Sequence, residues 1–184
     1  VAFYDGTDNA MACFEISNSE ISKLNIGDKA TAHYFDAANL DKWNKKYDMV
    51  ISTWFTPGNF HPDDFPFDDY KNAEKKLDLT TNEKFTTIFR NAYDLLNPGG
   101  EVVIGACYRD NTATRLKQEA SYQKMGMTVI TGEEDSFTAT KEKFWSQRFT
   151  KEKMFSYLSF INKKKFTFTA LDTYEYAMQV RIKK

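Results

Sequence analysis

The sequence predicts an α/β fold in which helices cover both faces of a mostly parallel sheet and an antiparallel hairpin ends the chain. Predicted strands and helices alternate over the first 106 residues, which is typical of a parallel sheet. The predicted strands at 47–51 and 101–106 are short apolar runs, as expected for strands that are buried on both faces. Two residues, Asp172 and Thr173, separate the last two predicted strands, and parallel strands need a much longer connection.

The first part of the chain contains two predicted strand–helix pairs. Asp8 is in a position to cap the first helix, and Gly27 can end it. The second strand is followed at once by an acid, Asp36. In order, these elements are a strand at 1–4 with a turn at 5–8, a helix at 9–24, a strand at 29–35 and a short helix at 37–45.

The middle of the chain adds two strands, a long loop and a helix. The strand at 47–51 leads into a loop at 55–70, and loops of this length inside a compact domain are often functional. The next helix has a predicted capping box, Thr80 with Glu83. We expect Asn97-Pro98-Gly99-Gly100 to end that helix before the strand at 101–106.

The tail departs from simple alternation. We expect a helix at 112–126, a hairpin within 127–149, a helix that begins after Thr150, and a final pair of antiparallel strands at 165–171 and 174–182. No linker or repeat divides the 184 residues, so the sequence predicts a single domain.

Composition narrows the classes of function. The net charge of −1 gives no basic excess typical of nucleic-acid binding, and we interpret Lys163-Lys164-Lys165 as a solvated turn. Cys13 and Cys107 lack metal-site spacing, so no metal is predicted. No apolar run is long enough to span a membrane. We therefore expect a cytoplasmic protein with neither nucleic-acid nor membrane partners, and the oligomeric state stays open.

Two acids follow consecutive predicted strands. In an open parallel sheet, ligands bind at the carboxyl ends of the strands. A carboxylate can accept hydrogen bonds from ribose hydroxyls or from the amine of a base, so Asp8 and Asp36 suit a cofactor that carries adenosine. The alternative for Asp8 is a helix cap, and for Asp36 a turn residue.

Four segments in this order resemble class I S-adenosylmethionine-dependent methyltransferases, whose fold is Rossmann-like. The first is Gly6-Thr7-Asp8 followed by Met11, although Ala10 stands where the family pattern has serine. The others are Phe35-Asp36-Ala37, Tyr47-Asp48-Met49-Val50-Ile51-Ser52 and Leu95-Leu96-Asn97-Pro98-Gly99-Gly100. The resemblance covers nearly all of the chain.

The resemblance implies S-adenosylmethionine as the cofactor. Asp8 would bind the ribose hydroxyls, and Asp36 with Ala37 would meet the adenine. Thr53 and Trp54, at the end of the third strand, complete the expected cofactor-binding set. The family's first strand and glycine-rich loop are not found in this sequence, so we expect it to be a truncated piece of a longer protein in which they precede Val1.

The loop after the third strand is the expected source of acceptor contacts. It lacks the family's D/N-P-P-Y motif, so methylation of DNA bases or glutamine is not expected. Phe55 and Phe60 could form an apolar wall with Trp54, and His61 is the candidate general base. Tyr108 and Arg109, after the fourth strand, could also contact substrate.

The position of residues 112–149 corresponds to the place where many small-molecule methyltransferases insert elements that cover the substrate. The sequence therefore predicts an enzyme that methylates a small molecule. Two alternatives stay open: an NAD(P)-dependent oxidoreductase or epimerase, and a non-catalytic methyltransferase-like interaction domain. The final hairpin and the absence of a Tyr-x-x-x-Lys dyad count against the first of these.

Overall fold

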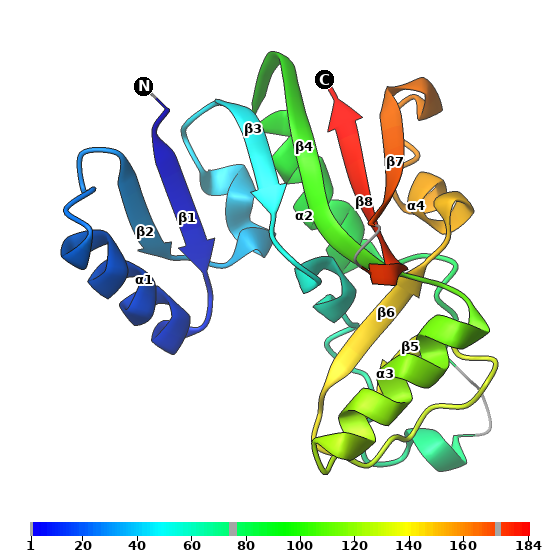
Figure 1. Ribbon diagram of the computed structural model, residues 1–184. Coiled ribbons are helices and arrows are strands. Elements are labelled where there is room, and N and C mark those ends of the chain that lie inside the picture. The colour runs from blue at the N-terminus through cyan, green and yellow to red at the C-terminus, as the bar shows by residue number, and fades with distance from the viewer. Residues whose placement is uncertain (1, 74–76, 172–173) are drawn as a thin grey trace. The chain divides into compact units, whose positions relative to one another are not determined.

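The computed structural model describes residues 2–73, 77–171 and 174–184. The chain divides into two compact units (Figure 1), the smaller formed by residues 1–44 and the larger by residues 45–184. Val1 and the two residues that separate the last two predicted strands, Asp172 and Thr173, lie outside the described residues.

The smaller unit is a two-stranded parallel sheet with one α-helix. It contains β1 (Tyr4–Asp8), α1 (Met11–Lys23), β2 (Ala30–Tyr34) and the 3₁₀ helix η1 (Ala37–Lys42). Tyr4 pairs with Ala30 and Asp8 with Tyr34. The prediction of a turn at residues 5–8 was wrong. Gly6 continues the strand, because a parallel partner is available along its whole length.

Packing in the smaller unit is thin. α1 buries none of its residues. One side-chain hydrogen bond links the strands, between His33 Nε2 and Asp5 Oδ1 at 2.9 Å, and the Asp5 side chain is only 3% exposed. The Trp43 ring packs edge-on against His33 and Phe35, at 4.8 and 5.0 Å between ring centroids. His33 is thus structural.

The larger unit is built on a six-stranded sheet. Its strands are β3 (Tyr47–Ser52), β4 (Leu96–Arg109), β5 (Phe137–Ala139), β6 (Trp145–Phe149), β7 (Phe166–Leu171) and β8 (Tyr174–Lys183). β4 is central: β8 pairs along one edge, while β3 and then β6 pair along the other.

The prediction of a mostly parallel sheet was wrong, because the sheet of the larger unit is mixed. β3 and β6 run parallel to β4, but β8 is antiparallel to both β4 and β7, and β5 is antiparallel to β6. Short connections cause this result, since they allow only antiparallel pairing. The antiparallel arrangement of the last two strands is the one that their short connection predicts.

Three α-helices belong to the larger unit, α2 (Glu83–Asp94), α3 (Thr112–Lys124) and α4 (Lys151–Tyr157). Asn82, not Thr80, caps α2, because its side chain accepts a hydrogen bond from Phe85 N at 2.9 Å. Thr150 caps α4 as expected. Shorter 3₁₀ helices are η2 (Thr56–Asn59), η3 (Tyr70–Asn72) and η4 (Lys163–Lys165).

β4 begins earlier than the sequence suggests, at Leu96, and contains the Pro98-Gly99-Gly100 segment. Gly99 has a φ of +82°, a conformation that favours glycine. A Cβ atom on Gly100 would lie 2.8 Å from the carbonyl oxygen of Asp48. The two glycines therefore permit the close approach of β3 to β4 rather than only ending a helix.

No helix among residues 2–73, 77–171 and 174–184 is both long enough and apolar enough to cross a bilayer.

Candidate functional site

The two predicted acids lie at the same end of the smaller unit's sheet. Asp8 is the last residue of β1, and Asp36 follows β2 by two residues. Phe35 N donates to Asp8 O at 3.0 Å, which continues the pairing between the strands up to that edge. The parallel direction of β1 and β2 brings both acids to their carboxyl ends, where ligands bind in open α/β sheets.

Each acid also organises the backbone that follows it. Asp8 Oδ1 accepts a hydrogen bond from Ala10 N at 2.8 Å, and Asp36 Oδ1 accepts one from Ala38 N at 2.9 Å. Ala37, between the strand end and this contact, opens η1. A carboxylate has acceptor capacity for several hydrogen bonds, so these local contacts leave capacity for a ligand.

An open hollow of about 490 Å³ adjoins the carboxyl ends of β1 and β2. This volume lies within the range of about 300–1,000 Å³ that small-molecule sites occupy. The lining combines two aromatic rings, a carboxylate, two amides and an amine, and consists of Asn9, Tyr34, Phe35, Asp36, Asn39 and Lys42. Lys42 Nζ donates to Asn39 Oδ1 at 2.9 Å. Of the two acids, Asp36 lines the hollow and Asp8 does not.

An aromatic group lies at the carboxyl ends of β3 and β4 in the larger unit. It comprises Trp54, Phe55, Tyr108 and Tyr176. The Phe55 and Tyr108 rings stack at 4.0 Å with an angle of 8°, and Tyr176 lies parallel to both at 6.3 and 5.7 Å. Trp54 meets Phe55 edge-on at 5.3 Å.

Trp54 has an energetically unfavourable backbone conformation, and its side chain is exposed. Its φ is +50°, which is uncommon for a bulky residue, and 61% of its surface is accessible. Its carbonyl accepts a hydrogen bond from Ala106 N at 3.1 Å. A Cβ atom on Gly105 would lie 3.1 Å from Ser52 O, so a glycine there lets this segment approach β4. Backbone strain of this kind clusters at functional sites.

The aromatic group is mainly apolar at neutral pH. Burial raises the pKa of the Tyr108 hydroxyl above its ordinary value, so the hydroxyl stays protonated. Lys117 Nζ lies 4.8 Å from the centre of the Tyr176 ring and adds a positive charge at its face. The group can therefore contact a planar ligand through ring faces while Lys117 provides a cation beside them.

The other predicted residues lie in different places. Phe60 packs against Phe85 and Phe89 of α2, at 6.4 and 6.3 Å between ring centroids. His61 packs against Phe67 and Trp145, at 5.4 and 5.9 Å. Neither has a ring contact with the aromatic group among the described residues. Thr53 and Arg109 are exposed, beside Trp54 and Tyr108 respectively.

The His61 ring has a defined hydrogen bond. Its Nδ1 lies 2.7 Å from Pro62 O. A carbonyl oxygen only accepts, so Nδ1 is the donor in this contact and Nε2 is the other ring nitrogen left to bond elsewhere.

Residues 112–149 are held by a buried network around Arg148, which is 1% exposed. Its guanidinium donates to Thr138 Oγ1 at 2.7 Å, to Gln118 Oε1 at 2.9 Å and to Asp110 Oδ1 at 3.3 Å. It also donates to the carbonyls of Asp135 and Phe137. Burial lowers the pKa of Arg148 from its ordinary value, but an arginine remains charged in proteins.

Sequence reasoning missed three parts of this arrangement. Tyr176 joins the aromatic group from β8, and Lys117 from α3, because the fold brings distant segments together. Gly105 had a visible signal, since a glycine inside an apolar strand often marks a bulge or a close backbone approach. Within the described part of the chain, no group of three or more His, Cys, Asp or Glu side chains could hold a metal ion.

Neither a protein-family model nor a curated protein matches the sequence. Solved structures are similar, at low sequence identity. They include S-adenosylmethionine-dependent methyltransferases from Clostridium acetobutylicum (10% identity, 97% of this chain and 74% of that one, TM-score 0.58) and Methanosarcina mazei (12%, 98% and 81%, 0.57). A candidate rRNA methylase from Clostridium thermocellum is also similar (15%, 98% and 74%, 0.52).

These similarities show the fold. The chain has the fold of class I S-adenosylmethionine-dependent methyltransferases. It spans only 42–52% of several longer structures that are also similar.

Proposed function

We propose that the protein is an S-adenosylmethionine-dependent methyltransferase that transfers a methyl group to a small-molecule acceptor. The observation that carries the proposal is the pair of acids, Asp8 and Asp36, at the carboxyl ends of two neighbouring parallel strands. The methyltransferase fold supports the same conclusion. We further propose that it works in the cytoplasm.

Asp8 and Asp36 would hold the adenosine part of the cofactor. Asp8 would accept hydrogen bonds from the ribose hydroxyls, and Asp36, with Ala37 beside it, would accept one from the adenine amine. The hollow lined by Tyr34, Phe35 and Asp36 supports the part of this assignment that concerns Asp36. Thr53 and Trp54 are proposed to contact the cofactor from the end of β3. When bound, S-adenosylmethionine would supply the methyl group from its sulfonium sulfur, and S-adenosylhomocysteine would be the leaving group.

The aromatic group would bind the acceptor. Trp54 and Phe55 offer apolar ring surface, and Tyr108 a protonated hydroxyl, with Arg109 as a neighbouring cation. Positioning of donor and acceptor can contribute roughly 7–11 kcal/mol to such a reaction, so a rigid stack of rings is suited to the task. Phe60 is proposed to contribute indirectly, by packing the acceptor loop onto α2.

His61 is the proposed general base. Its Nδ1 hydrogen bond to Pro62 O fixes the ring orientation and leaves Nε2 to accept a proton from the acceptor. Residues 112–149 are the proposed cover of the acceptor, and the Arg148 network would keep that cover rigid.

Calorimetric titration with S-adenosylhomocysteine tests the cofactor assignment. We expect binding to the wild type and a loss of about 10- to 100-fold in affinity for Asp8→Asn and Asp36→Asn, since hydrogen bonds to charged groups contribute about 1.5–3 kcal/mol. Asp28→Asn is the matched control, because Asp28 is an exposed acid of the same unit. Equal affinities for all three variants would overturn the assignment.

The same titration separates the alternatives. Binding of NAD instead of S-adenosylhomocysteine would favour an oxidoreductase or epimerase. Binding of neither would favour a non-catalytic interaction domain.

The acceptor class is tested with a tritiated methyl donor and size-separated cell extract. We expect label in the low-mass fraction, with loss of transfer in Trp54→Ala and partial recovery in Trp54→Phe, which keeps an aromatic ring. Because one similar structure is named as a candidate rRNA methylase, the extract includes RNA. Label in the RNA or protein fraction would overturn the small-molecule assignment.

A further inference from the structure

Positive side chains and aromatic rings alternate over one face of the larger unit. We call this surface the cation–aromatic face. It is formed by α4, η4, β7 and the ends of α2 and β8. Five of the six cation–ring pairs among the described residues lie on it. They are Arg90–Phe160 (4.2 Å), Lys163–Phe155 (5.2 Å), Lys151–Phe168 (5.4 Å), Lys184–Tyr93 (5.7 Å) and Lys165–Tyr93 (5.8 Å).

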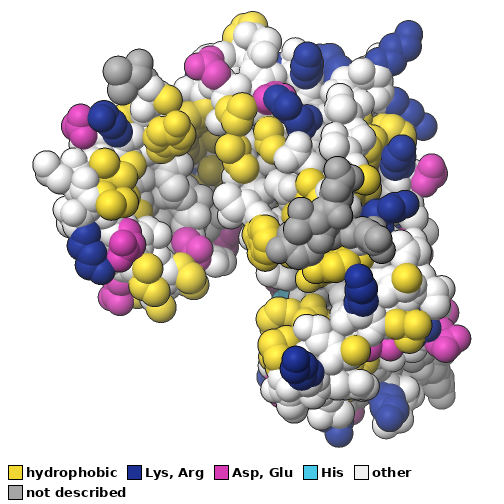
Figure 2. Space-filling view, in the orientation of Figure 1, with side chains coloured by type: hydrophobic (Ala, Val, Ile, Leu, Met, Phe, Trp, Pro, Cys, Tyr) yellow, Lys and Arg dark blue, Asp and Glu magenta, His cyan; other side chains and the backbone are white. Residues whose placement is uncertain are grey.

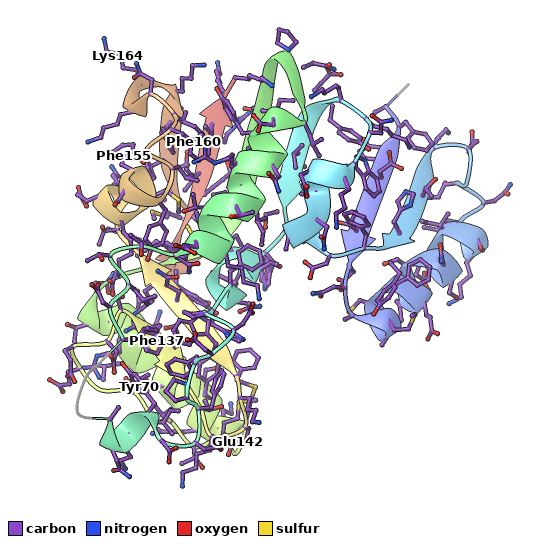
Figure 3. The ribbon with its side chains drawn as sticks, turned by 180° about the vertical axis from the view of Figure 1, so that it is seen from behind. Tyr70, Phe137, Glu142, Phe155, Phe160 and Lys164 are labelled. Carbon is purple, nitrogen blue, oxygen red and sulfur yellow. The ribbon has the colours of Figure 1, made fainter. Side chains whose placement is uncertain are left out.

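The rings form two connected clusters. Phe155 meets Phe166 and Phe168 edge-on at 5.1 and 5.4 Å, and Tyr93 meets Phe160 at 6.3 Å. η4 joins the clusters, because Lys163 lies over a ring of the first and Lys165 over a ring of the second. Figure 3 shows Phe155, Phe160 and Lys164 at the same corner of the larger unit.

The charge of this face is largely uncompensated. Residues 151–184 contain eight Lys or Arg and three Asp or Glu. Two of these cations, Lys153 and Arg181, pair with acids outside the segment, Asp110 and Glu101. Among the described residues, none of the cations in the five pairs forms an ion pair with an acid. Glu152 is the acid near Lys151 and Lys163. Lys and Arg side chains gather over the β7 and β8 region in Figure 2.

The whole-chain charge conceals this distribution. The smaller unit has seven acids and three Lys or Arg, while the larger unit has nineteen and twenty-two. A net charge of −1 therefore combines an acidic unit with a basic one, and it gives no information about any single face. For that reason the expectation of no nucleic-acid partner does not extend to this surface.

The geometry favours nucleic acid over a membrane. Insertion into a bilayer needs exposed apolar side chains, but none of the strongly exposed large hydrophobic residues lies in the described part of 151–184. The rings here are half-buried, with cations at their faces. Lysines beside ring surfaces are the combination that binds single strands, with phosphates on the cations and bases stacked on the rings.

We propose that the cation–aromatic face binds single-stranded nucleic acid. Phosphates contact Lys163, Lys164, Lys165 and Lys184, and bases stack against Phe155 and Phe160. The site is separate from the residues proposed for methyl transfer, so it does not depend on that function.

Fluorescence anisotropy with labelled 20-nucleotide strands of uridine RNA and thymidine DNA, and with a duplex of equal length, tests the proposal. We expect single strands to bind more tightly than the duplex, whose bases are already stacked. The affinity of the wild type should fall steeply with salt. For single strands the logarithmic slope is about −0.7 for each neutralised phosphate. Equal affinity for RNA and DNA would indicate that the face contacts phosphates and bases alone. A preference for RNA would indicate that it also contacts the 2′-hydroxyl.

The lysine contribution is tested by replacing Lys163, Lys164 and Lys165 together with Ala. We expect at least a tenfold loss of affinity and a salt slope shallower by about 2, since three phosphate contacts are removed. Replacement of Lys71, Lys124 and Lys141 with Ala is the matched control, because these lysines are exposed elsewhere in the same unit. Equal losses in the two triple variants would overturn the proposal.

Phe155→Leu separates stacking from charge. It should weaken single-strand binding about fivefold or more and leave the salt slope unchanged. No binding of the wild type to any strand at 50 mM salt (roughly the low-salt end of such measurements) would overturn the proposal. So would binding to phosphatidylserine vesicles without binding to strands. Both readouts use the wild type and do not depend on the folding of a variant.

Discussion

The two units of this protein differ in how much of their structure is buried. Only one of the buried hydrophobic residues in the described chain, Leu40, belongs to the smaller unit. The larger unit buries whole rings, such as Phe85, Phe137 and Phe149. A unit of 44 residues is also near the size at which a hydrophobic core alone rarely supports folding. We infer that the stability of the protein comes mainly from residues 45–184.

The proposed functions follow the same division. The smaller unit has a thin core and supplies the acids at its strand ends. The larger unit supplies the aromatic group and the cation–aromatic face on a densely packed sheet. Ligand-binding side chains and the free energy of folding therefore need not come from the same segment. Paired substitutions, one in each unit, test this inference.

The largest difference is expected from core truncation. Phe85 has no exposed surface and contacts Phe60, Phe89, Phe149 and Tyr157. Phe85→Ala should lower the free energy of unfolding by about 3–5 kcal/mol, through lost burial and the cavity left behind. Urea denaturation followed by tryptophan fluorescence measures the change.

The matched variant in the smaller unit is Ile16→Ala. Ile16 lies on α1 and is 63% exposed, and surface substitutions usually change stability by no more than about 0.5 kcal/mol. A loss of several kcal/mol in this variant would contradict the inference that the smaller unit contributes little packing.

The buried charge of the larger unit should give the next effect. Arg148→Met removes a guanidinium that serves Asp110, Gln118 and Thr138. Breaking a buried charge network typically costs about 3–5 kcal/mol. We expect a value near the lower end, about 3 kcal/mol, because Asp110 is 23% exposed and can be hydrated.

Asp110→Asn is the control, because it keeps the shape of the side chain and removes its charge. It should lower the urea midpoint less than Arg148→Met does. A midpoint for Arg148→Met equal to that of the wild type would mean that the network adds nothing to stability.

One glycine in each unit shows how closely the surrounding atoms are packed. A Cβ atom on Gly100 would lie 2.8 Å from Asp48 O, whereas a Cβ atom on Gly27 would meet nothing within 4 Å. Gly100→Ala should therefore destabilise the protein by about 1–3 kcal/mol through overpacking. Gly27→Ala should be neutral or stabilising by less than about 1 kcal/mol, because it restricts the unfolded chain. The thermal midpoints of both variants test this contrast, and equal shifts would contradict it.

Much of the local structure could be predicted from the sequence because it depends on neighbouring residues. The run Tyr47 to Ser52 forms β3, Thr150 caps α4, and the final strands pair in an antiparallel manner. Asp8 and Asp36 lie at the expected strand ends because a parallel pair fixes which ends coincide.

Contacts between distant segments could not be predicted. Tyr176 and Lys117 reach the aromatic group from β8 and α3, and no periodicity relates them to Phe55. The buried network of Arg148 is a similar case, since an isolated arginine in sequence usually indicates a surface. The mixed sheet was missed because alternation of elements says nothing about the direction of strands that follow position 110.

The smallest difference in stability between the two units is expected at acidic pH, from one ion pair in each unit. In the larger unit, Arg181 hydrogen-bonds to Glu101, and this contact holds the pKa of the Glu101 carboxyl below its usual value. A carboxyl whose pKa is lower in the folded state stabilises the protein above its unfolded pKa of about 4.3, and loses this contribution as the pH falls through the folded value. Between pH 5 and pH 3, Glu101→Gln should therefore lose less stability than the wild type does.

The pair Glu20–Lys23 in the smaller unit is the matched case. Its side chains are 54% and 65% exposed, and exposed pairs add little to stability. Acid unfolding is measured by circular dichroism at a fixed urea concentration. Glu20→Gln should follow the curve of the wild type. Glu101→Gln should converge on that curve only as the pH approaches 3. If Glu20→Gln flattened the curve as much as Glu101→Gln does, the acid sensitivity of the two units would be alike, and the division of stability between them would have to be abandoned.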